Sequence, residues 1–416
     1  MPSRRRAGRR PAALAASAAL ALLLLAPAPA LLAQAAAPAP EPEGLAGTLQ
    51  GILDAKTSSG ELVGAVFVAR RGGETVFEGA SGLMDREAGI PMRMDALFRL
   101  ASVSKAFTSA AAAAMFSRGG ISLDDPVTRH LPGFAPTMPD GSPAVITLRH
   151  LLTHTSGLGY GFEETAGGPL HRAGVSDGCS RDEGLTLDEN MRRLASVPLL
   201  FAPGTSWRYS LSADVMGAVM AAAAGKPLPT VMGELVTGPL DLPDTDYYAR
   251  DPSRLAVPYA DSGGRIHRMA DPENYPLGGG RTFIYSPGRA LDPGAWPSGG
   301  CGMVSSARDV SILVDAVARS GEGFADPKVM EWFLSDAAAP LDSGADEGFG
   351  GGWSYLKAPV HGPWSPGTVT WSGVYGNRWF ADPASGISAA LLTNTALAGM
   401  SGNTMDLLAE ALYSAR

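Results

Sequence analysis

Cysteine, histidine and lysine are scarce in this sequence of 416 residues. It contains two cysteines, six histidines and five lysines, the lysines among 33 basic residues. Few histidines stand in contexts that suggest catalysis, so a Ser-His-Asp triad has no support. Cys179 and Cys301 could pair after export or remain free thiols, and the sequence leaves both alternatives open.

Charge is also low. Charged residues make up 18% of the chain and hydrophobic residues 45%, a balance typical of a folded globular protein. The length is sufficient for two lobes around a large shared core. The formal net charge of −8 argues against binding to nucleic acid, so we expect no nucleic-acid partner.

The N-terminus has the composition of a secretory signal peptide. Five arginines precede an apolar run, Ala12–Leu25, which only Ser17 interrupts, and Ala33-Gln34-Ala35 offers a small-x-small cleavage site. We therefore predict that residues 1–35 are a signal peptide. The protein would be exported, either to the periplasm or out of the cell.

A membrane anchor is the alternative interpretation of this segment. The apolar run is short for a span, and Pro27 and Pro29 interrupt its extension, which favours removal and no stable membrane span afterwards. Removal would take the net charge from −8 to −13, because five arginines and no acidic residue are lost. Residues 36–43, AAPAPEPE, are expected to form a short stiff Pro/Ala linker.

Strand patterns lie near both ends of the remaining chain, and helical patterns lie between them. The expected strands are Val63–Arg70, Glu74–Ala80, Trp353–Leu356, Val369–Phe380 and Gly386–Thr393, and the expected helices include Gly44–Ser58, Leu148–Thr153, Leu187–Ala195, Ala213–Ala224 and Met405–Tyr413. We predict an α+β fold with an antiparallel sheet built from both chain ends, flanked by helices. In this domain, 44–416, the sheet lobe would span about 44–100 and 298–416, and an inserted, mainly helical lobe about 101–297.

Lys105 stands in an otherwise alanine-rich and apolar segment, FRLASVSKAF followed by TSAAAAAMF. A helix that is apolar all round is normally buried, and a buried ammonium tends to lose its proton. Ser102 is three residues earlier on the same helix face, at the first turn, where free amides favour negative charge. The chain uses 28 arginines and five lysines, so a lysine here indicates that deprotonation matters. The pair is predicted to be a nucleophile and its base.

Four segments together carry a resemblance to a known family. They are FRLASVSKAF (98–107), ITLRHLLTHTSGL (146–158), FAPGTSWRYS (201–210) and GGCGMVSSARDV (299–310). In order and spacing the chain resembles the serine beta-lactamase and penicillin-binding-protein superfamily from about Gly44 onward, most closely its class C-like esterase branch. The resemblance implies that superfamily's fold and an acyl-enzyme mechanism, for which we expect neither metal nor cofactor.

The resemblance also implies which residues act. Ser102 would be the nucleophile, with Lys105 and Tyr209 as general base and acid. A third family motif, usually Lys-Thr-Gly, matches Trp371-Ser372-Gly373 on a strand edging the site, and the backbone amides of Ser102 and Val374 would form the oxyanion hole. From the residues alone, Tyr209 could also be a partly buried aromatic without a catalytic role.

Two departures from the family pattern concern the substrate. Leu211 stands where beta-lactamases and D-alanyl peptidases usually carry an asparagine that holds the substrate amide, and Trp371 stands in place of a cation that holds a carboxylate. A tryptophan offers a large apolar wall instead. We expect a neutral ester or lipophilic acyl group, with Trp371, Ser372, Gly373 and Leu211 around it; Ser212 or Asp214 could replace some of the lost polar contacts.

Three other patterns were weighed against this assignment. Gly174–Gly178 matches Gly-x-Ser-x-Gly, but its flanks are a polar loop and not the strand and helix that a nucleophile elbow requires. His150 and His154 are four residues apart and could bind zinc, although no glutamate lies between them as in His-Glu-x-x-His. Gly157–Gly161 lacks the preceding strand of a dinucleotide-binding loop.

The sequence thus predicts an exported serine hydrolase that cleaves carboxylic esters, with a small-molecule ester or acyl compound as its partner. One alternative is a beta-lactamase or D-amino-acid peptidase, and another is an acyltransferase that uses the same site. A non-catalytic binding protein is a third, which the presence of Ser102, Lys105 and Tyr209 argues against. The sequence does not specify an oligomeric state.

Overall fold

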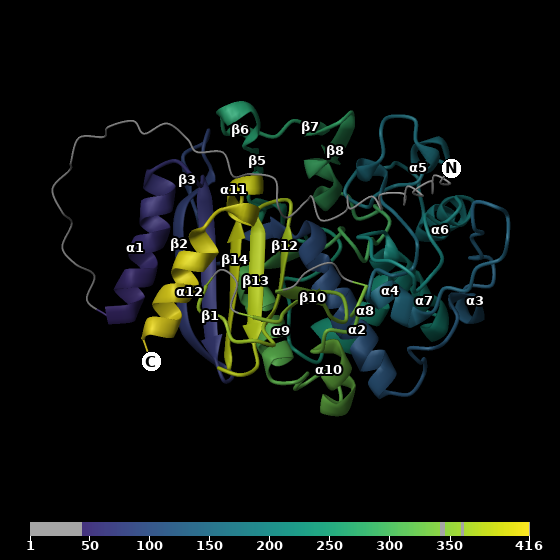
Figure 1. Ribbon diagram of the computed structural model, residues 1–416. Coiled ribbons are helices and arrows are strands. Elements are labelled where there is room, and N and C mark those ends of the chain that lie inside the picture. Colours follow the sequence, from purple (N-terminus) through teal and green to yellow (C-terminus); the bar gives the residue numbers. More distant parts are fainter. Residues whose placement is uncertain (1–43, 342–345, 359–361, 416) are drawn as a thin grey trace, which may run out of the picture. The chain divides into compact units, whose positions relative to one another are not determined.

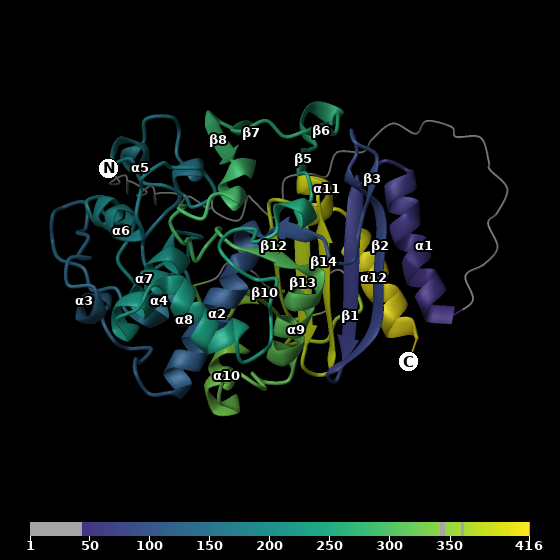
Figure 2. The same ribbon diagram turned by 180° about the vertical axis from the view of Figure 1, so that it is seen from behind.

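The computed structural model describes residues 44–341, 346–358 and 362–415, and the expected signal peptide and linker lie outside these ranges. A large antiparallel sheet carries helices on both faces, and further helices gather beside it (Figures 1 and 2). This combination confirms the predicted α+β class.

Eight strands form the main sheet in the order β10-β11-β12-β13-β14-β1-β2-β3, each antiparallel to its neighbours. The two chain ends meet where β1 pairs with β14, for example at Ala69 opposite Ala389. Both of these central strands are buried almost throughout, which explains their nearly unbroken apolar sequences. The strands are β1 Gly64–Arg71, β2 Glu74–Asp85, β3 Ile90–Pro91, β10 Glu347–Phe349, β11 Ser354–Leu356, β12 Val369–Gly373, β13 Asn377–Asp382 and β14 Ile387–Thr393.

The segment expected as one strand over Val369–Phe380 is two strands, β12 and β13, joined by a tight turn. Gly376 adopts φ +107° in this turn, and a Cβ atom at that position would lie 2.3 Å from the backbone oxygen of Thr395. Glycine therefore permits the chain to reverse where an apolar run suggested continuation. The reversal leaves Val374 at the edge of the sheet, directly after β12.

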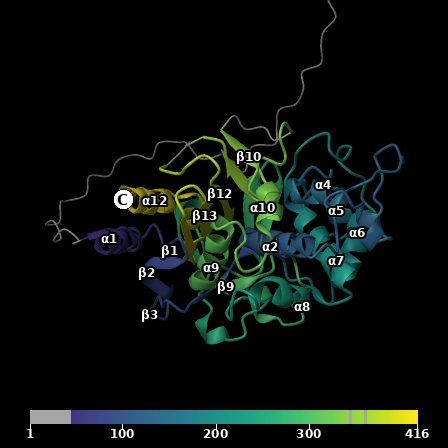
Figure 3. The ribbon, with the colours of Figure 1, turned by 90° about the horizontal axis from the view of Figure 1, so that it is seen from below.

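Side chains of β1 alternate between two hydrophobic cores. Phe67 contributes to the core beneath α1 (Gly44–Ser58) and α12 (Thr404–Ser414), whereas Val66 and Val68 contribute to the larger core on the opposite face. Helix α9 (Ala307–Ala318) packs on that opposite face (Figure 3). The sheet is therefore the middle layer of three.

Helix α2 (Ser104–Ser117) is the buried axis of the region beside the sheet. Residues 110–114, all alanine, are completely buried, and such small side chains allow α7 (Ser212–Ala224) to pack closely against α2. The remaining helices are α3 Val127–His130, α4 Leu148–Leu152, α5 Pro169–Arg172, α6 Leu187–Ala195, α8 Leu228–Met232, α10 Pro327–Phe333 and α11 Ala396–Ser401. Short strand pairs join β4 Leu97–Arg99 to β9 Val304–Ser306, β5 Tyr259–Ala260 to β6 His267–Arg268, and β7 Glu273–Gly278 to β8 Arg281–Tyr285.

Single helical turns complete the described chain. They are η1 Ala101–Val103, η2 Gly161–Glu163, η3 Gly233–Thr237, η4 Pro252–Arg254, η5 Ser262–Gly264 and η6 Pro287–Leu291. Within the described ranges, no helix by itself has the length and apolar character of a bilayer span; the bent pair Ser212–Ala224 and Leu228–Thr237 meets these criteria jointly.

A disulfide joins Cys179 to Cys301, with 5.4 Å between their Cα atoms. It connects the irregular segment Gly159–Gly184 to the chain just before β9. Of the two alternatives that the sequence left open, the structure has the paired form. The two cysteines are 122 residues apart in sequence, so the tertiary fold brings them together.

Candidate active site

Ser102 lies in η1, between the end of β4 and the start of α2. The residue before it, Ala101, is buried and adopts φ +44°, a conformation that non-glycine residues rarely occupy. Such strain persists where the surrounding structure imposes it, and it is frequent at functional sites. Here it turns the chain sharply from strand to helix at the predicted nucleophile.

Lys105 and Tyr209 both contact the hydroxyl of Ser102. The Tyr209 hydroxyl donates a hydrogen bond to Ser102 Oγ over 2.7 Å, and Lys105 Nζ donates to the same oxygen over 3.3 Å. Lys105 Nζ also lies 4.7 Å from the centre of the Tyr209 ring. The structure thus brings the three predicted catalytic residues together, although 107 residues separate Ser102 from Tyr209.

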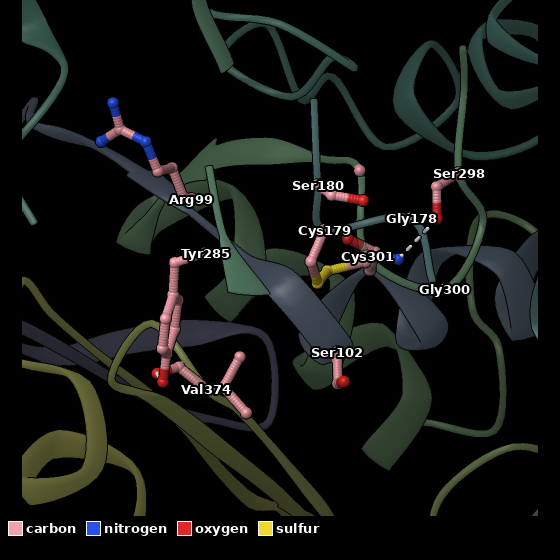
Figure 4. The surroundings of a disulfide bond; sticks show 12 residues. Arg99, Ser102, Gly178, Cys179, Ser180, Tyr285, Ser298, Gly300, Cys301 and Val374 are labelled. Carbon is pink, nitrogen blue, oxygen red and sulfur yellow. Dashed lines mark hydrogen bonds between the residues drawn. A yellow bond between two sulfur atoms is a disulfide. The ribbon is translucent and has the colours of Figure 1, made fainter. Parts of the chain in front are cut away.

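Lys105 is 1% exposed and is held by the backbone of a neighbouring loop. Its Nζ donates a 2.8 Å hydrogen bond to the carbonyl oxygen of Gly300. Gly300 directly precedes Cys301 of the disulfide, as Figure 4 shows. The backbone N–H of Gly300 in turn donates to the buried carboxylate of Asp214, which also accepts from Ser298 Oγ. Burial raises the pKa of Asp214, while the Ser298 hydroxyl and Lys105 oppose that shift.

The third motif lies beside the nucleophile. Gly373 ends β12 so close to η1 that a Cβ atom there would lie 2.2 Å from the backbone oxygen of Leu100. One strand further, the side-chain amide of Asn377 donates to the backbone oxygen of Arg99, which fixes β13 against the same turn. Only a residue without a side chain permits this approach of β12 to the nucleophile.

The approach places Val374 near Ser102, as Figure 4 shows. Among the described residues, neither the N–H of Ser102 nor that of Val374 has a hydrogen-bond acceptor. Two free amides at the head of a helix and the edge of a strand are the arrangement that an oxyanion hole requires.

Aromatic side chains surround the reactive groups. The Trp371 ring lies 5.5 Å from Tyr209 and 5.4 Å from Phe349, measured between ring centres, and remains partly exposed. Tyr160 packs on the other side of Tyr209 at 5.1 Å and stacks on Phe162. The walls are therefore largely apolar, with hydroxyl groups at a few points.

The other predicted substrate-binding residues differ in accessibility. Ser372 is partly exposed beside Trp371, and Gly373 contributes backbone. Leu211 is 0% exposed and belongs to the larger core, so its side chain presents no surface to a ligand. This geometry gives the predicted contact between Leu211 and substrate no support.

None of the patterns set aside in the sequence has the geometry of the alternative site that it suggested. Ser176 of the Gly-x-Ser-x-Gly match bonds to Asp182 and Asn190 in a loop. His150 completes the capping box of α4 with Thr147, and His154 faces Ser210 instead. Within the residues that the structure describes, no three His, Cys, Asp or Glu side chains are grouped as a metal site would need.

Sequence reasoning missed the part that His154 takes in the site. Its ring centre lies 4.9 Å from that of Tyr209, and its Nδ1 is 3.1 Å from Ser210 Oγ. Burial holds the pKa of His154 well below the usual value, and Lys105 lowers it further. The sequence signal was present, because His154 stands within a quoted family segment, but it was considered only as a metal ligand.

Comparison with known proteins agrees with this geometry. The beta-lactamase family model matches residues 45–412. Esterase EstB of Burkholderia gladioli is 45% identical over 381 residues, covering 89% of this chain and 95% of that protein. The chain therefore belongs to the beta-lactamase family, and with Ser102 at its centre it is a serine hydrolase.

Solved structures give the same fold. EstCE1, a hydrolase with promiscuous acyltransferase activity, superposes with a TM-score of 0.85 at 40% identity, covering 89% of this chain and 98% of that one. Simvastatin synthase from Aspergillus terreus superposes with a TM-score of 0.68 at 20% identity, covering 88% and 96%. The second likeness concerns the fold alone.

Proposed function

We propose that this protein hydrolyses carboxylic esters through an acyl-enzyme on Ser102. The observation that carries the proposal is the convergence of Tyr209 Oη and Lys105 Nζ on Ser102 Oγ, next to two unbonded backbone amides. A nucleophile, a proton-transfer pair and an oxyanion site are the parts that acyl transfer needs.

The geometry suggests the following steps. Ser102 Oγ attacks the ester carbonyl while its proton passes to the Tyr209–Lys105 pair, and the amides of Ser102 and Val374 hold the oxyanion. The ester C–O bond then breaks, and the pair returns the proton to the leaving alcohol. Water attacks the acyl-enzyme in the same way, so that the acid is released and Ser102 regains its proton.

The surroundings favour a neutral and partly apolar substrate. Trp371 occupies the head of the third motif, and position 211 offers no amide, so the site lacks the groups that would hold a carboxylate and an acylamide. The 45% identity to a protein named as an esterase supports the same substrate class. We infer esters with a hydrophobic acyl or alcohol portion, bound against Trp371 and its aromatic neighbours.

Acyl transfer to an alcohol is a second candidate for the same site. It is favoured by the 40% identity to a hydrolase with promiscuous acyltransferase activity. Both reactions share the acyl-enzyme, and they differ in whether water or an alcohol attacks it. The ratio of ester product to free acid, measured in the presence of an added alcohol, separates them.

The decisive test is labelling and turnover with the intact protein. A fluorophosphonate should add one adduct, located on Ser102 by peptide mass spectrometry, and nitrophenyl esters of increasing acyl length should be hydrolysed. Nitrocefin should be turned over poorly. Absence of an adduct, an adduct elsewhere, or efficient nitrocefin hydrolysis without ester hydrolysis would overturn the proposal.

We further propose export to the periplasm or beyond. The N-terminal sequence carries this proposal, and the Cys179–Cys301 disulfide is consistent with an oxidising compartment. In a bacterial host, the secreted or periplasmic protein should begin close to Ala36 by intact mass. A full-length protein retained in the cytoplasm would contradict it.

A further inference from the structure

His154 occupies an unusual backbone position at the end of α4. The N–H of His154 bonds to the oxygen of Leu151 over 3.2 Å, and the N–H of Thr155 bonds to the oxygen of His150 over 2.9 Å. These two bonds form a Schellman helix end, in which the residue at position 154 is left-handed and is usually glycine. His154 adopts φ +53° there, so a side chain is retained where the backbone favours none.

His154 has three contacts with the segment that carries Tyr209, two through its side chain and one through its backbone. Its Nδ1 is hydrogen-bonded to Ser210 Oγ at 3.1 Å, its backbone oxygen accepts the N–H of Arg208 at 2.9 Å, and its ring packs on Tyr209. The residues immediately before and after Tyr209 are thus both bonded to one residue. His154 contacts neither Ser102 nor the open part of the site, because it is 2% exposed and lies behind the tyrosine.

The hydrogen bond of His154 continues into the protein core. Ser210 Oγ is 2.8 Å from Ser212 Oγ, which is 2.8 Å from Ser156 Oγ, and all three hydroxyls are buried. A buried hydroxyl chain of this kind is satisfied from within and holds its members in fixed rotamers. The imidazole is its outermost member, next to the tyrosine.

We propose that His154 is a positioning residue that fixes the ring of Tyr209 against Ser102. The proposal rests on the function proposed above, since Tyr209 matters only if it moves a proton for Ser102. The imidazole packs against the Tyr209 ring and is hydrogen-bonded to Ser210, and it does not act as an acid or base. A misplacement of the phenol by about 1 Å can cost roughly a hundredfold in rate.

Two substitutions separate positioning from helix capping. His154→Gly suits the left-handed backbone but removes the imidazole, so the fold should persist while kcat for a nitrophenyl ester falls between about ten- and a hundredfold. His154→Asn tolerates the same backbone and can still bond Ser210, so kcat should lie between those of His154→Gly and the wild type. KM should change little in both, and His267→Asn, at a partly exposed histidine of β6, is the matched control.

A double-mutant cycle with Tyr209→Phe distinguishes an effect of His154 through Tyr209 from a purely structural role of His154. The rate of Ser102 phosphonylation by a fluorophosphonate is measured in both backgrounds. If His154 acts through Tyr209, His154→Gly should slow the wild type but add little to Tyr209→Phe. If His154→Gly does not fold, Ser210→Ala, which removes the hydrogen bond and leaves the ring, takes its place in the cycle.

Equal losses in both backgrounds would overturn the proposal, as would unchanged kcat in both His154→Gly and Ser210→Ala. Failure of the proposed function looks different, because the wild-type protein would then neither hydrolyse esters nor label on Ser102. If the wild type hydrolyses esters but the effects of the two substitutions are additive, the proposed esterase function stands and the proposed role of His154 fails.

Discussion

At the scale of single residues, the buried amine of Lys105 is the most exacting feature of the site. It donates to Gly300 O and to Ser102 Oγ, and its burial leaves little room for a longer side chain. A buried cation without hydrogen-bond partners is energetically costly, so polar groups must face the charged nitrogen. Gly300 and Ser102 supply those polar groups, and the Tyr209 ring lies 4.7 Å from the nitrogen.

Lys105→Arg should therefore abolish turnover. A guanidinium does not lose its proton near neutral pH, so it cannot take the proton of Ser102, and we expect kcat to fall by about a thousandfold or more. Lys105→Met, of similar length and without charge, is the matched control for packing. Both are assayed with a short-chain nitrophenyl ester and checked by circular dichroism; an active arginine variant would remove the role of base.

At the scale of elements, catalysis depends on how closely β12 approaches η1. The Cβ of an alanine at position 373 would overlap the backbone oxygen of Leu100, so the strand edge with Val374 must move away. The amide of Val374 is then displaced from the oxyanion while the catalytic side chains keep their places. Gly373→Ala would thus change the position of a backbone hydrogen-bond donor. A side-chain substitution at Val374 would not test that position.

Gly373→Ala should lower kcat about 10²- to 10³-fold, the loss seen when one oxyanion donor is removed. Gly133→Ala is the matched control, because a Cβ there meets no atom within 4 Å and the backbone is not left-handed. Steady-state kinetics with one ester measures both. Wild-type kcat in Gly373→Ala would show that the strand edge does not hold the oxyanion.

The segment Gly159–Gly184 contains a carboxylate, that of Asp177, which should make the free energy of unfolding depend on pH. Asp177 is partly buried and accepts the backbone N–H groups of Gly161 and Phe162. Burial raises its pKa to about 7. An unfolded aspartate has a pKa of about 3.9, so between these values the folded state binds a proton that the unfolded state does not.

The free energy of unfolding should consequently fall as pH rises from about 4 to about 7. The contribution of Asp177 is at most about 4 kcal/mol across this window, at roughly 1.4 kcal/mol for each unit of pKa shift. Asp177→Asn loses one of the two accepted hydrogen bonds but cannot ionise, so it should flatten the decline. Urea unfolding at several pH values measures the difference, and parallel slopes in the two proteins would contradict it.

At the scale of the whole molecule, the disulfide joins two parts of the site that the chain separates. Cys301 follows Gly300, which holds Lys105, and Cys179 follows the Asp177–Gly178 turn. A cross-link across 122 residues removes much freedom from the unfolded chain. It therefore stabilises the fold and keeps the segment Gly159–Gly184 against the loop that holds Lys105.

Replacing both cysteines by serine should lower the free energy of unfolding by about 2–4 kcal/mol, the usual range for a long loop. The wild type treated with a thiol reductant should lose a similar amount, and the double variant should be insensitive to the reductant. Denaturant midpoints with and without reductant give the comparison. Equal stability of the oxidised wild type and the double variant would show that the bond contributes nothing.

Local patterns predicted the central strands of the sheet and brought forward three residues that the structure places in contact. β1, β14 and the flanking helices α1 and α12 follow from apolar periodicity, and Ser102, Lys105 and Tyr209 follow from the motifs and their spacing. Val369–Phe380 was misread as one strand, because an apolar run does not reveal a turn that needs Gly376 for a close approach to Thr395. The sequence suggested that Leu211 lies against the substrate, whereas its side chain is buried. The sequence did not reveal this burial, because it depends on how α7 packs.

The sequence by itself determined that Ser102 and Lys105 lie together at the head of a buried helix, since both residues belong to one local stretch of chain. Its hydrophobic runs near both chain ends also indicated one antiparallel sheet built from the two ends, whereas the order of the strands came from the structure. Tertiary structure alone decided that Cys179 pairs with Cys301, that Gly300 holds Lys105, and that His154 flanks Tyr209. These contacts join residues far apart in the chain, and their distances depend on packing that no local pattern encodes.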